Sequence, residues 1–292
     1  MLIRKLLTSL VLIASASHGA IAEDARAIVK SYLDRNDGTT EINAGKLVSC
    51  RYAMKDGKLI CAEKPQIKVM ESVRKDYGAT EKDSKTVSII VSPASEKGVG
   101  FLQYDYEEIE RDSDQWMYFS ALRKVKRIVS GSENEPKTGS FFGSEYSYED
   151  MEKDDLEDHT YKLIGSETYL GRDCWVIEST PTPEEAKKSN YGKSTSWIDK
   201  ERNLVLKSEM LDRRGREFKR LTVLKVDNIN GVWMAMVSTM NNLQAKRMST
   251  LIKEKISLNA PVQDDYLTQR TLTDEAFRES RLQEFRQSLE RS

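Results

Sequence analysis

The chain has 292 residues, of which 38% are hydrophobic and 32% are charged, and its formal net charge is −1. This composition excludes a collagen-like or broadly disordered chain, because enough apolar side chains are present to form a core. The balanced charge excludes a nucleic-acid binder that works through a bulk positive field. Only two histidines occur, His18 and His159, which leaves little scope for histidine-based catalysis or a multi-histidine metal site.

The first 22 residues have the pattern of a secretory signal peptide. Arg4 and Lys5 supply the positive region, residues 6–16 form a short apolar region, and the Ala-Ile-Ala at 20–22 fits the small-x-small cleavage pattern. The apolar run is too short for the ~20 residues of a spanning helix. An uncleaved anchor is the alternative. No cysteine follows the predicted cleavage after Ala22, so we expect an exported protein without a lipid anchor.

Cys50 and Cys61 flank an Asp-Gly pair at 56–57, which is a strong hairpin signal. A four-residue loop over 54–57 would place the two cysteines opposite each other, where an oxidising compartment permits a disulfide. A two-residue Asp-Gly turn would shift the register and take them out of direct opposition. We predict the Cys50–Cys61 disulfide, and we interpret Cys174 as a buried strand cysteine rather than a reactive thiol.

The first element after the signal peptide is a helix, predicted over Glu23–Asp37. Its apolar residues recur at spacings of three and four, and Gly38 can end it. Beyond this helix the apolar period becomes two. Strand-like runs follow at Val87–Val91, Val99–Tyr106, Gln115–Ser120, Leu122–Val129, Tyr161–Tyr169, Cys174–Ser179, Ser194–Asp199, Leu204–Leu211, Phe218–Val226, Val232–Met240, Ala245–Ile256 and Tyr266–Leu272.

Turn residues separate these runs, for example at Asp212–Gly215 and Asp227–Gly231. Many short strands at hairpin spacing indicate one large antiparallel sheet, which must curl or close to protect its edges. We expect residues 23–272 to form a single domain. The remaining Thr273–Ser292 predicts a polar helix with a thin apolar stripe, which either docks on the body or forms a mobile tail.

Motifs that carry catalysis are missing from the sequence. The glycines around Lys46 do not have phosphate-loop spacing, and there is no Gly-x-Ser-x-Gly, His-Glu-x-x-His or Cys-x-x-Cys. Three cysteines and the one histidine beyond the signal peptide cannot build a closed zinc site. We therefore predict no enzymatic activity, no cofactor and no metal.

Two charged segments allow more than one interpretation. Glu149–Asp158 holds seven acids but lacks the spaced ligands and central glycine of an EF-hand, so a solvated loop is favoured over a calcium or partner site. Arg123–Arg127 is a basic cluster, which we interpret as an exposed strand face. Contact with anionic lipid or a membrane partner is the alternative, and no nucleic-acid partner is expected.

The run Val232–Met240 is apolar on both faces and must be covered on both sides. Met234, Met236 and Met240 share one face, and methionines suit a lining that adapts to varied acyl chains. An ordinary core with methionine gap-fillers explains the run equally well.

A second segment, residues 139–150, concentrates aromatic side chains between glycines. It predicts a loop that either plugs or gates a cavity. The candidate residues at the cavity mouth are Phe141, Phe142, Tyr146 and Tyr148, with Trp116, Tyr118 and Leu122 on neighbouring strand segments.

The blocks at 114–128 and 139–150, together with weaker matches at Gly171–Glu178, Trp197–Asp199 and Gly231–Trp233, resemble a bacterial family. It is the family of outer-membrane lipoprotein-sorting-like proteins in the LolA/LolB-like superfamily, which are often linked to RND/MMPL-type exporters. The resemblance covers about residues 28–272.

The resemblance implies a strongly curved antiparallel sheet, an unclosed half barrel with helices covering its concave side and an apolar cavity between them. It further implies a periplasmic carrier or chaperone that binds acyl chains of lipids or lipoproteins and cooperates with an inner-membrane RND-type exporter. The alternative is a non-carrier adaptor that binds an exporter or envelope protein through the curved sheet.

Overall fold

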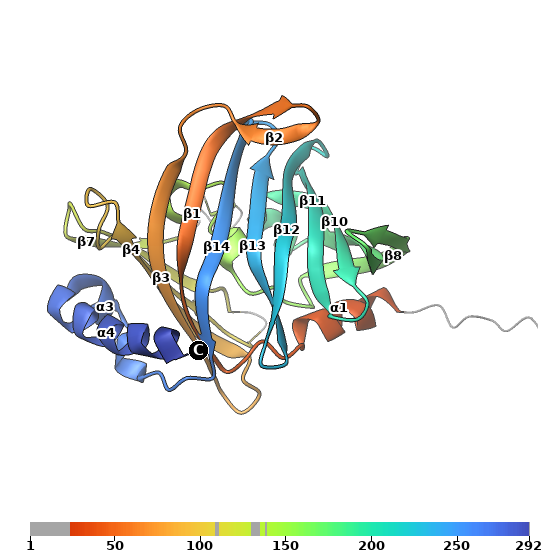
Figure 1. Ribbon diagram of the computed structural model, residues 1–292. Coiled ribbons are helices and arrows are strands. Elements are labelled where there is room, and N and C mark those ends of the chain that lie inside the picture. The colour runs from red at the N-terminus through yellow and green to blue at the C-terminus, as the bar shows by residue number, and fades with distance from the viewer. Residues whose placement is uncertain (1–23, 109–110, 130–134, 138, 292) are drawn as a thin grey trace, which may run out of the picture.

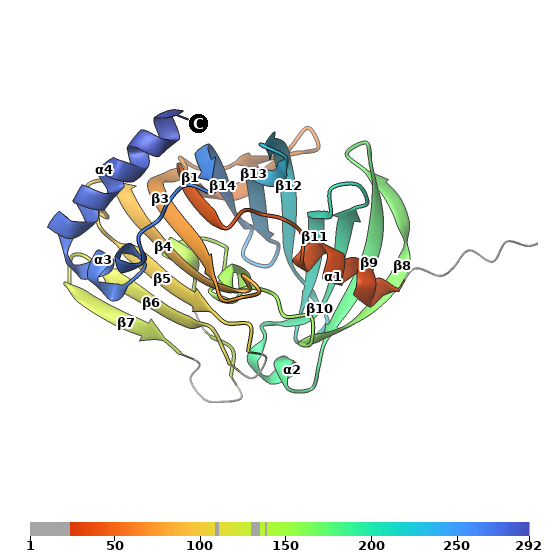
Figure 2. The same cartoon turned by 90° about the horizontal axis from the view of Figure 1, so that it is seen from below.

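The computed structural model describes residues 24–108, 111–129, 135–137 and 139–291. Across these ranges the main element is one antiparallel sheet of 14 strands that curls strongly but does not close (Figures 1 and 2). Its two free edges are β7 (Lys124–Ile128) and β8 (His159–Tyr169). The fold class predicted from the sequence is confirmed, whereas the predicted signal peptide, residues 1–22, lies outside the described residues.

Two meanders make up the sheet. The first contains β1 (Thr40–Lys55), β3 (Gln66–Tyr77), β4 (Asp83–Ser92), β5 (Gly100–Asp105), β6 (Asp114–Phe119) and β7. The second contains β8, β9 (Arg172–Pro181), β10 (Tyr191–Asp199), β11 (Leu204–Asp212), β12 (Glu217–Ile229), β13 (Val232–Asn242) and β14 (Arg247–Leu258). β1 pairs with β14 and joins the two meanders, with Leu47 beside Leu251.

The β1–β14 pairing bends at a bulge between Ala44 and Gly45. A Cβ atom at Gly45 would lie 1.9 Å from the carbonyl oxygen of Ile252, so the two backbones approach as closely as this only because residue 45 is glycine. The curl gives the sheet a concave inner face and a convex outer face. Successive side chains of each strand alternate between them.

The inner face of the second meander is covered by α1 (Ala25–Leu33), which is shorter than the helix predicted from the sequence. The Asp24 side chain caps it by accepting a 3.0 Å hydrogen bond from the backbone N–H of Arg26. Its apolar residues Ile28 and Val29 pack on Ile177 and Ile198 of β9 and β10. Because a helix of nine residues is marginal in isolation, this packing holds it in place.

The outer face of the first meander is covered by the C-terminal segment, which contains η3 (Asp264–Tyr266), α3 (Gln269–Thr273) and α4 (Glu275–Arg291). Leu282, Phe285 and Leu289 of α4 are buried against this face. The predicted apolar stripe therefore docks, and the predicted strand at 266–272 is wrong because the segment is helical. The resemblance implied helices on the concave side. α1 lies there, whereas α3 and α4 lie on the opposite, convex face (Figure 2).

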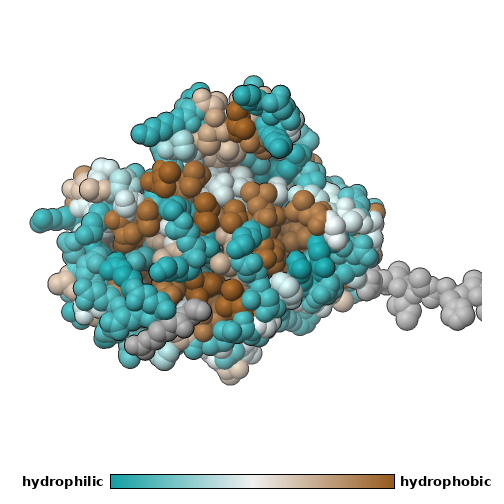
Figure 3. Space-filling model, in the orientation of Figure 1, coloured by the Kyte–Doolittle hydropathy of each residue, from teal (hydrophilic) through white to brown (hydrophobic). Residues whose placement is uncertain are grey.

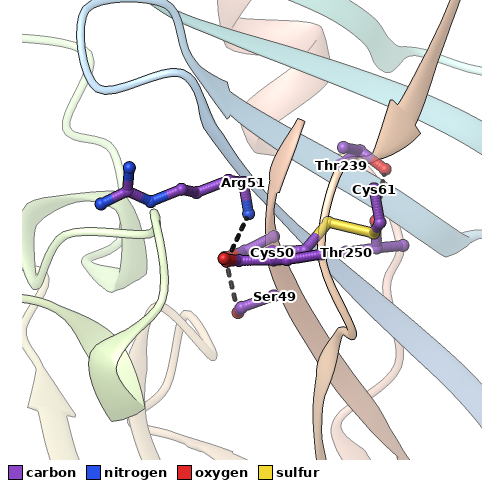
Figure 4. Close-up of a disulfide and its surroundings, with 8 residues drawn as sticks. Ser49, Cys50, Arg51, Cys61, Thr239 and Thr250 are labelled. Carbon is purple, nitrogen blue, oxygen red and sulfur yellow. Dashed lines mark hydrogen bonds between the residues drawn. A yellow bond between two sulfur atoms is a disulfide. The ribbon is translucent and has the colours of Figure 1, made fainter. Parts of the chain in front are cut away.

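The remaining strand, β2 (Lys58–Cys61), lies outside the two meanders and pairs with the end of β1. The turn is the two-residue Asp-Gly form, so Cys61 lies opposite Tyr52 and the four-residue loop is wrong. Cys50 and Cys61 nevertheless form a disulfide, with Cα atoms 5.7 Å apart (Figure 4). Cys50 lies on the same face of β1 as Tyr52, so it is the diagonal neighbour of Cys61. Cys174 is free and buried.

The outer face of the central strands is apolar over part of its area (Figure 3). Ile67 of β3 and Leu224 of β12 are exposed there. The neighbouring charges are paired, as in Lys46 with Glu254, whose Nζ and Oε1 atoms are 2.5 Å apart. Among the described residues, no helix is long and apolar enough to cross a membrane.

Candidate functional site

The aromatic segment, residues 139–151, lies on the inner face of the first meander and is here called the aromatic loop. It contains the short helices η1 (Phe141–Gly143) and η2 (Glu149–Met151). Phe141 is only 1% exposed and meets Phe101 of β5 edge to face, with ring centroids 5.3 Å apart. The Tyr148 ring stacks on Phe101 with a centroid distance of 6.0 Å. The loop thus fills this half of the concave face.

Polar contacts tie the aromatic loop to the strands beneath it. The Lys68 ammonium group donates to the carbonyl oxygen of Phe142 at 2.7 Å, and the Tyr146 hydroxyl donates to the carbonyl oxygen of Ser238 at 3.0 Å. Further contacts join Gln115 Nε2 to the Tyr148 carbonyl, Glu145 to Arg247, and Asp150 to Tyr191 and Lys219. Since these partners come from strands of both meanders, the loop is anchored to both halves of the inner face.

A buried amide and carboxylate network supports the loop from below. Gln103 Nε2 donates to the Asp105 carboxylate at 2.9 Å, and Gln115 Nε2 donates to Gln103 Oε1 at 2.8 Å. The same Gln103 amide reaches the carbonyl oxygen of Met151 at 2.5 Å. Buried polar groups with such partners specify one arrangement of the loop, because breaking any contact leaves an unsatisfied group.

A cavity of about 360 Å³ remains between the aromatic loop, α1 and the inner face of the second meander. Its volume lies at the small end of the usual range for ligand sites, ~300–1,000 Å³. Apolar walls come from Val29, Ile177, Ile198, Val205, Met210, Leu221 and Met240. Serines 179, 194, 196 and 208 line the same cavity on the strand side. It can therefore enclose an apolar chain and also offer hydroxyl groups to a polar atom.

The cavity adjoins a larger, highly charged cleft of about 840 Å³. The two share Leu33, Glu149, Glu152 and Asp154, so these residues stand where one opens into the other. Burial raises the pKa of Glu152 to about 7, against the opposing effect of Lys137. Acidic side chains predominate in the lining of the cleft, which gives the entrance negative potential.

Two further carboxyl groups in the cleft also have raised pKa values. Burial, together with the nearby Asp158 and Glu149, raises the pKa of Glu185 to about 7. The pKa of Asp158 is raised to about 6, chiefly by burial and then by Asp155. The run 149–158 is thus not simply a solvated loop, because it forms one wall of the cleft. Within the described ranges, no cluster of His, Cys, Asp and Glu could hold a metal ion.

The structure separates the predicted site residues into distinct groups. Tyr146 and Met240 line the cavity, while Phe141, Phe142 and Tyr148 pack in the core beside it. Met234 and Met236 are buried in a separate cluster with Ile256, outside the cavity lining.

Three predicted positions need correction. Trp116 and Tyr118 lie on the outer face with α3 and α4, on the side of the sheet opposite to the aromatic loop. The reason is alternation, since Met117 between them points inward. Leu122 is 66% exposed at the β6–β7 turn and lines neither the cavity beneath α1 nor the charged cleft beside it.

Other cavity residues were missed from the sequence. The serines of β9, β10 and β11 interrupt runs that otherwise look like ordinary strand cores. Their spacing of two, as in Ser194 and Ser196, was the available signal that one face of these strands is not fully packed.

An open, curled antiparallel sheet with a partly filled concave face defines the LolA-like class of fold. A DUF1329 family protein from Desulfovibrio piger matches with a TM-score of 0.74 and 22% identity, over 85% of this chain and 97% of that one. A "putative outer membrane lipoprotein-sorting protein domain" from Vibrio parahaemolyticus matches with 0.73 and 24%, over 85% and 98%. A LolA superfamily protein from Nitrosomonas europaea matches with 0.58 and 18%, over 85% and 98%.

The chain also belongs to a family defined at the sequence level. The family model described as "-like: Uncharacterized protein" matches residues 82–274, well over half of the chain. No curated protein matches the sequence significantly. The structural likenesses have identities below 25% and establish the fold alone.

Proposed function

We propose that this protein is a periplasmic carrier that binds acyl chains of lipids or lipoproteins in the cavity beneath α1. The observation that supports the proposal is the 360 Å³ space left between α1, the aromatic loop and the strands of the second meander. Each CH₂ group transferred from water into such a space contributes about 0.8 kcal/mol. No bond is made or broken, so the carrier needs no catalytic group.

The charged cleft gives the proposed cargo an orientation. The acyl chain would occupy the apolar cavity, and the polar end would emerge past Glu149, Glu152 and Asp154 into the cleft. Because this rim is acidic, a neutral, zwitterionic or cationic polar end would be preferred over an anionic one. Release to an outer-membrane acceptor, and supply by an RND/MMPL-type exporter, form part of the proposal through the family resemblance.

Native mass spectrometry of protein purified after export tests the proposal. Ser194→Phe places a large side chain in the cavity, whereas Thr195→Phe places the same side chain on the opposite face of β10. We expect the wild type and Thr195→Phe to carry copurified acyl chains, and Ser194→Phe to lose most of them. Equal loading of the two variants, or a wild type without lipid, would reject the carrier function.

A further inference from the structure

The β1–β2 hairpin, residues 52–61, projects beyond the end of the sheet and is stapled at its base (Figures 1 and 4). The Cys50–Cys61 disulfide joins it to the main part of β1. Backbone hydrogen bonds also fix the base, from Tyr52 N–H to the Lys246 carbonyl at 3.1 Å and from Ala62 N–H to the Arg51 carbonyl at 2.8 Å. A two-stranded hairpin is marginal in water, so this disulfide keeps a projecting ribbon folded.

Apolar side chains lie on both faces of the projecting ribbon. Met54 pairs with Leu59 on one face, and Ala53 pairs with Ile60 on the other. Met54, Leu59 and Ile60 are 63%, 41% and 39% exposed. A protein partner docked on one face would leave the other in water, whereas an apolar medium around the ribbon covers both.

The hairpin and its base are also cationic. Arg51, Lys55, Lys58 and Lys64 are all exposed, against the two acids Asp56 and Glu63. None of the four cationic groups makes an ion pair with a residue that the structure describes. By contrast, Lys46 and Lys225 beside the apolar outer face are paired, Lys225 with Asp227 at 2.6 Å. The cations of the hairpin are therefore free for an external anion.

We infer that the β1–β2 hairpin docks the protein on an anionic phospholipid bilayer. Met54, Leu59 and Ile60 enter the interfacial region, and the lysine stems extend so that their ammonium groups reach lipid phosphates. The carboxylate of Asp56 at the turn limits the depth, so the ribbon lies at headgroup level and does not cross the hydrocarbon core. The full sequence has a net charge of −1, so its bulk charge gives no general attraction to such a surface.

Vesicle flotation tests the inference with protein purified after export by a bacterial host. The probes are vesicles of phosphatidylcholine alone and of phosphatidylcholine with about a quarter phosphatidylglycerol. We expect binding to the anionic vesicles only, weakening as salt is raised. Lys55→Glu with Lys58→Glu should lower the partition coefficient roughly tenfold or more, at ~1 kcal/mol for each basic residue removed from the surface.

A second pair of variants separates the apolar contribution from charge. Met54→Ser with Leu59→Ser should weaken binding severalfold at unchanged net charge. Leu170→Ser, at the exposed β8–β9 turn, is the matched control and should bind as the wild type does. All these side chains are exposed, so thermal unfolding should be unaffected.

Three outcomes would overturn the inference. They are binding of the wild type to neither vesicle, unchanged binding of both hairpin variants, and equal loss in Leu170→Ser. Hairpin variants that keep full vesicle binding but lose a copurifying protein would assign the hairpin to a protein partner instead. Acyl loading of the cavity is read separately, so failure here leaves the carrier proposal to its own test.

Discussion

Lys219 on β12 and Asp150 in the aromatic loop form an ion pair, with Nζ and Oδ2 2.7 Å apart and side chains only 5% and 8% exposed. Asp150 also accepts hydrogen bonds from the Ser147 amide and the Tyr191 hydroxyl. One carboxylate thus joins the loop to two strands of the second meander. The stability of the molecule should therefore depend on this buried ion pair.

Removal of the Lys219 charge should be strongly destabilising. Lys219→Met leaves Asp150 buried without its counter-ion, and breaking such a pair costs about 3–5 kcal/mol in unfolding free energy. Lys225→Met, on the same strand, breaks an exposed pair and should cost less than about 1 kcal/mol. Urea unfolding of both variants gives the comparison. Equal losses would show that burial of the pair contributes nothing.

The aromatic loop should behave as a fixed plug rather than a swinging gate. Phe141→Ala removes a fully buried ring and should lower the unfolding free energy by about 3–5 kcal/mol. Phe119→Ala, at an exposed position on β6, should cost less than about 1 kcal/mol. A small loss for Phe141→Ala, combined with faster uptake of lipid, would instead favour the gate.

Stability should rise as the pH falls from about 7 towards about 5, because of carboxyl groups in the cleft. Burial raises the pKa values of Glu152 and Glu185 to about 7 from an ordinary 4.5, so the folded state binds protons more tightly than the unfolded state in this window. Their contribution is lost as the pH rises through 7. His159, whose pKa burial lowers, acts in the opposite direction below its ordinary 6.5.

The contribution of one carboxyl group can be isolated with Glu185→Gln. This variant should be more stable than the wild type by roughly 1 kcal/mol at pH 8, after allowance for partial exposure, and should match it near pH 5. Glu184→Gln, at the exposed neighbouring position, is the control. Chemical unfolding at several pH values measures both. A constant difference between Glu185→Gln and the wild type would contradict the expected linkage.

Loss of the disulfide should loosen the β1–β2 hairpin more than the sheet. Cys61→Ala opens the constraint on a segment of about 11 residues, for which chain entropy predicts a loss of up to ~3 kcal/mol. Because the hairpin strands pair with each other and the hairpin contacts the β13–β14 turn at its base, the effect should be local. Hydrogen exchange should quicken at Ala53–Ile60 and stay unchanged on β12. Uniform acceleration across the sheet would show that the disulfide supports the whole fold.

The parts of the fold that depend on local sequence patterns could be predicted. The N-terminal helix, the strands from residue 87 to 256 and the Asp-Gly hairpin follow from periodicity and turn residues. β1 and β3 were not predicted because charged residues interrupt them, as in Gly45-Lys46 and Lys68, which bonds to the aromatic loop. Their burial is set by partners far away in the sequence.

The site was less predictable because alternation identifies two faces of a strand without saying which is concave. Trp116 and Met117 are neighbours on β6 and point to opposite faces of the sheet. Which face is concave is determined by packing, with α4 on the outer face and the aromatic loop on the inner face. Tyr146 and Met240, which line the cavity, were proposed from the sequence because aromatic and methionine residues are conspicuous. The serines of the cavity were not, since serine is common on any half-exposed strand.

The pairing of β1 with β14 also determines the order in which the protein can fold. Leu47 meets Leu251, a partner some 200 residues away, so the central strand of the sheet must wait for almost the whole chain. Until then, β1 presents an unpaired edge, and β3 to β6 lack the cover that α4 provides. A nascent chain that emerges N-terminus first is therefore open to wrong strand pairing throughout its synthesis. Folding should be slow, late and dependent on helpers that shield that edge.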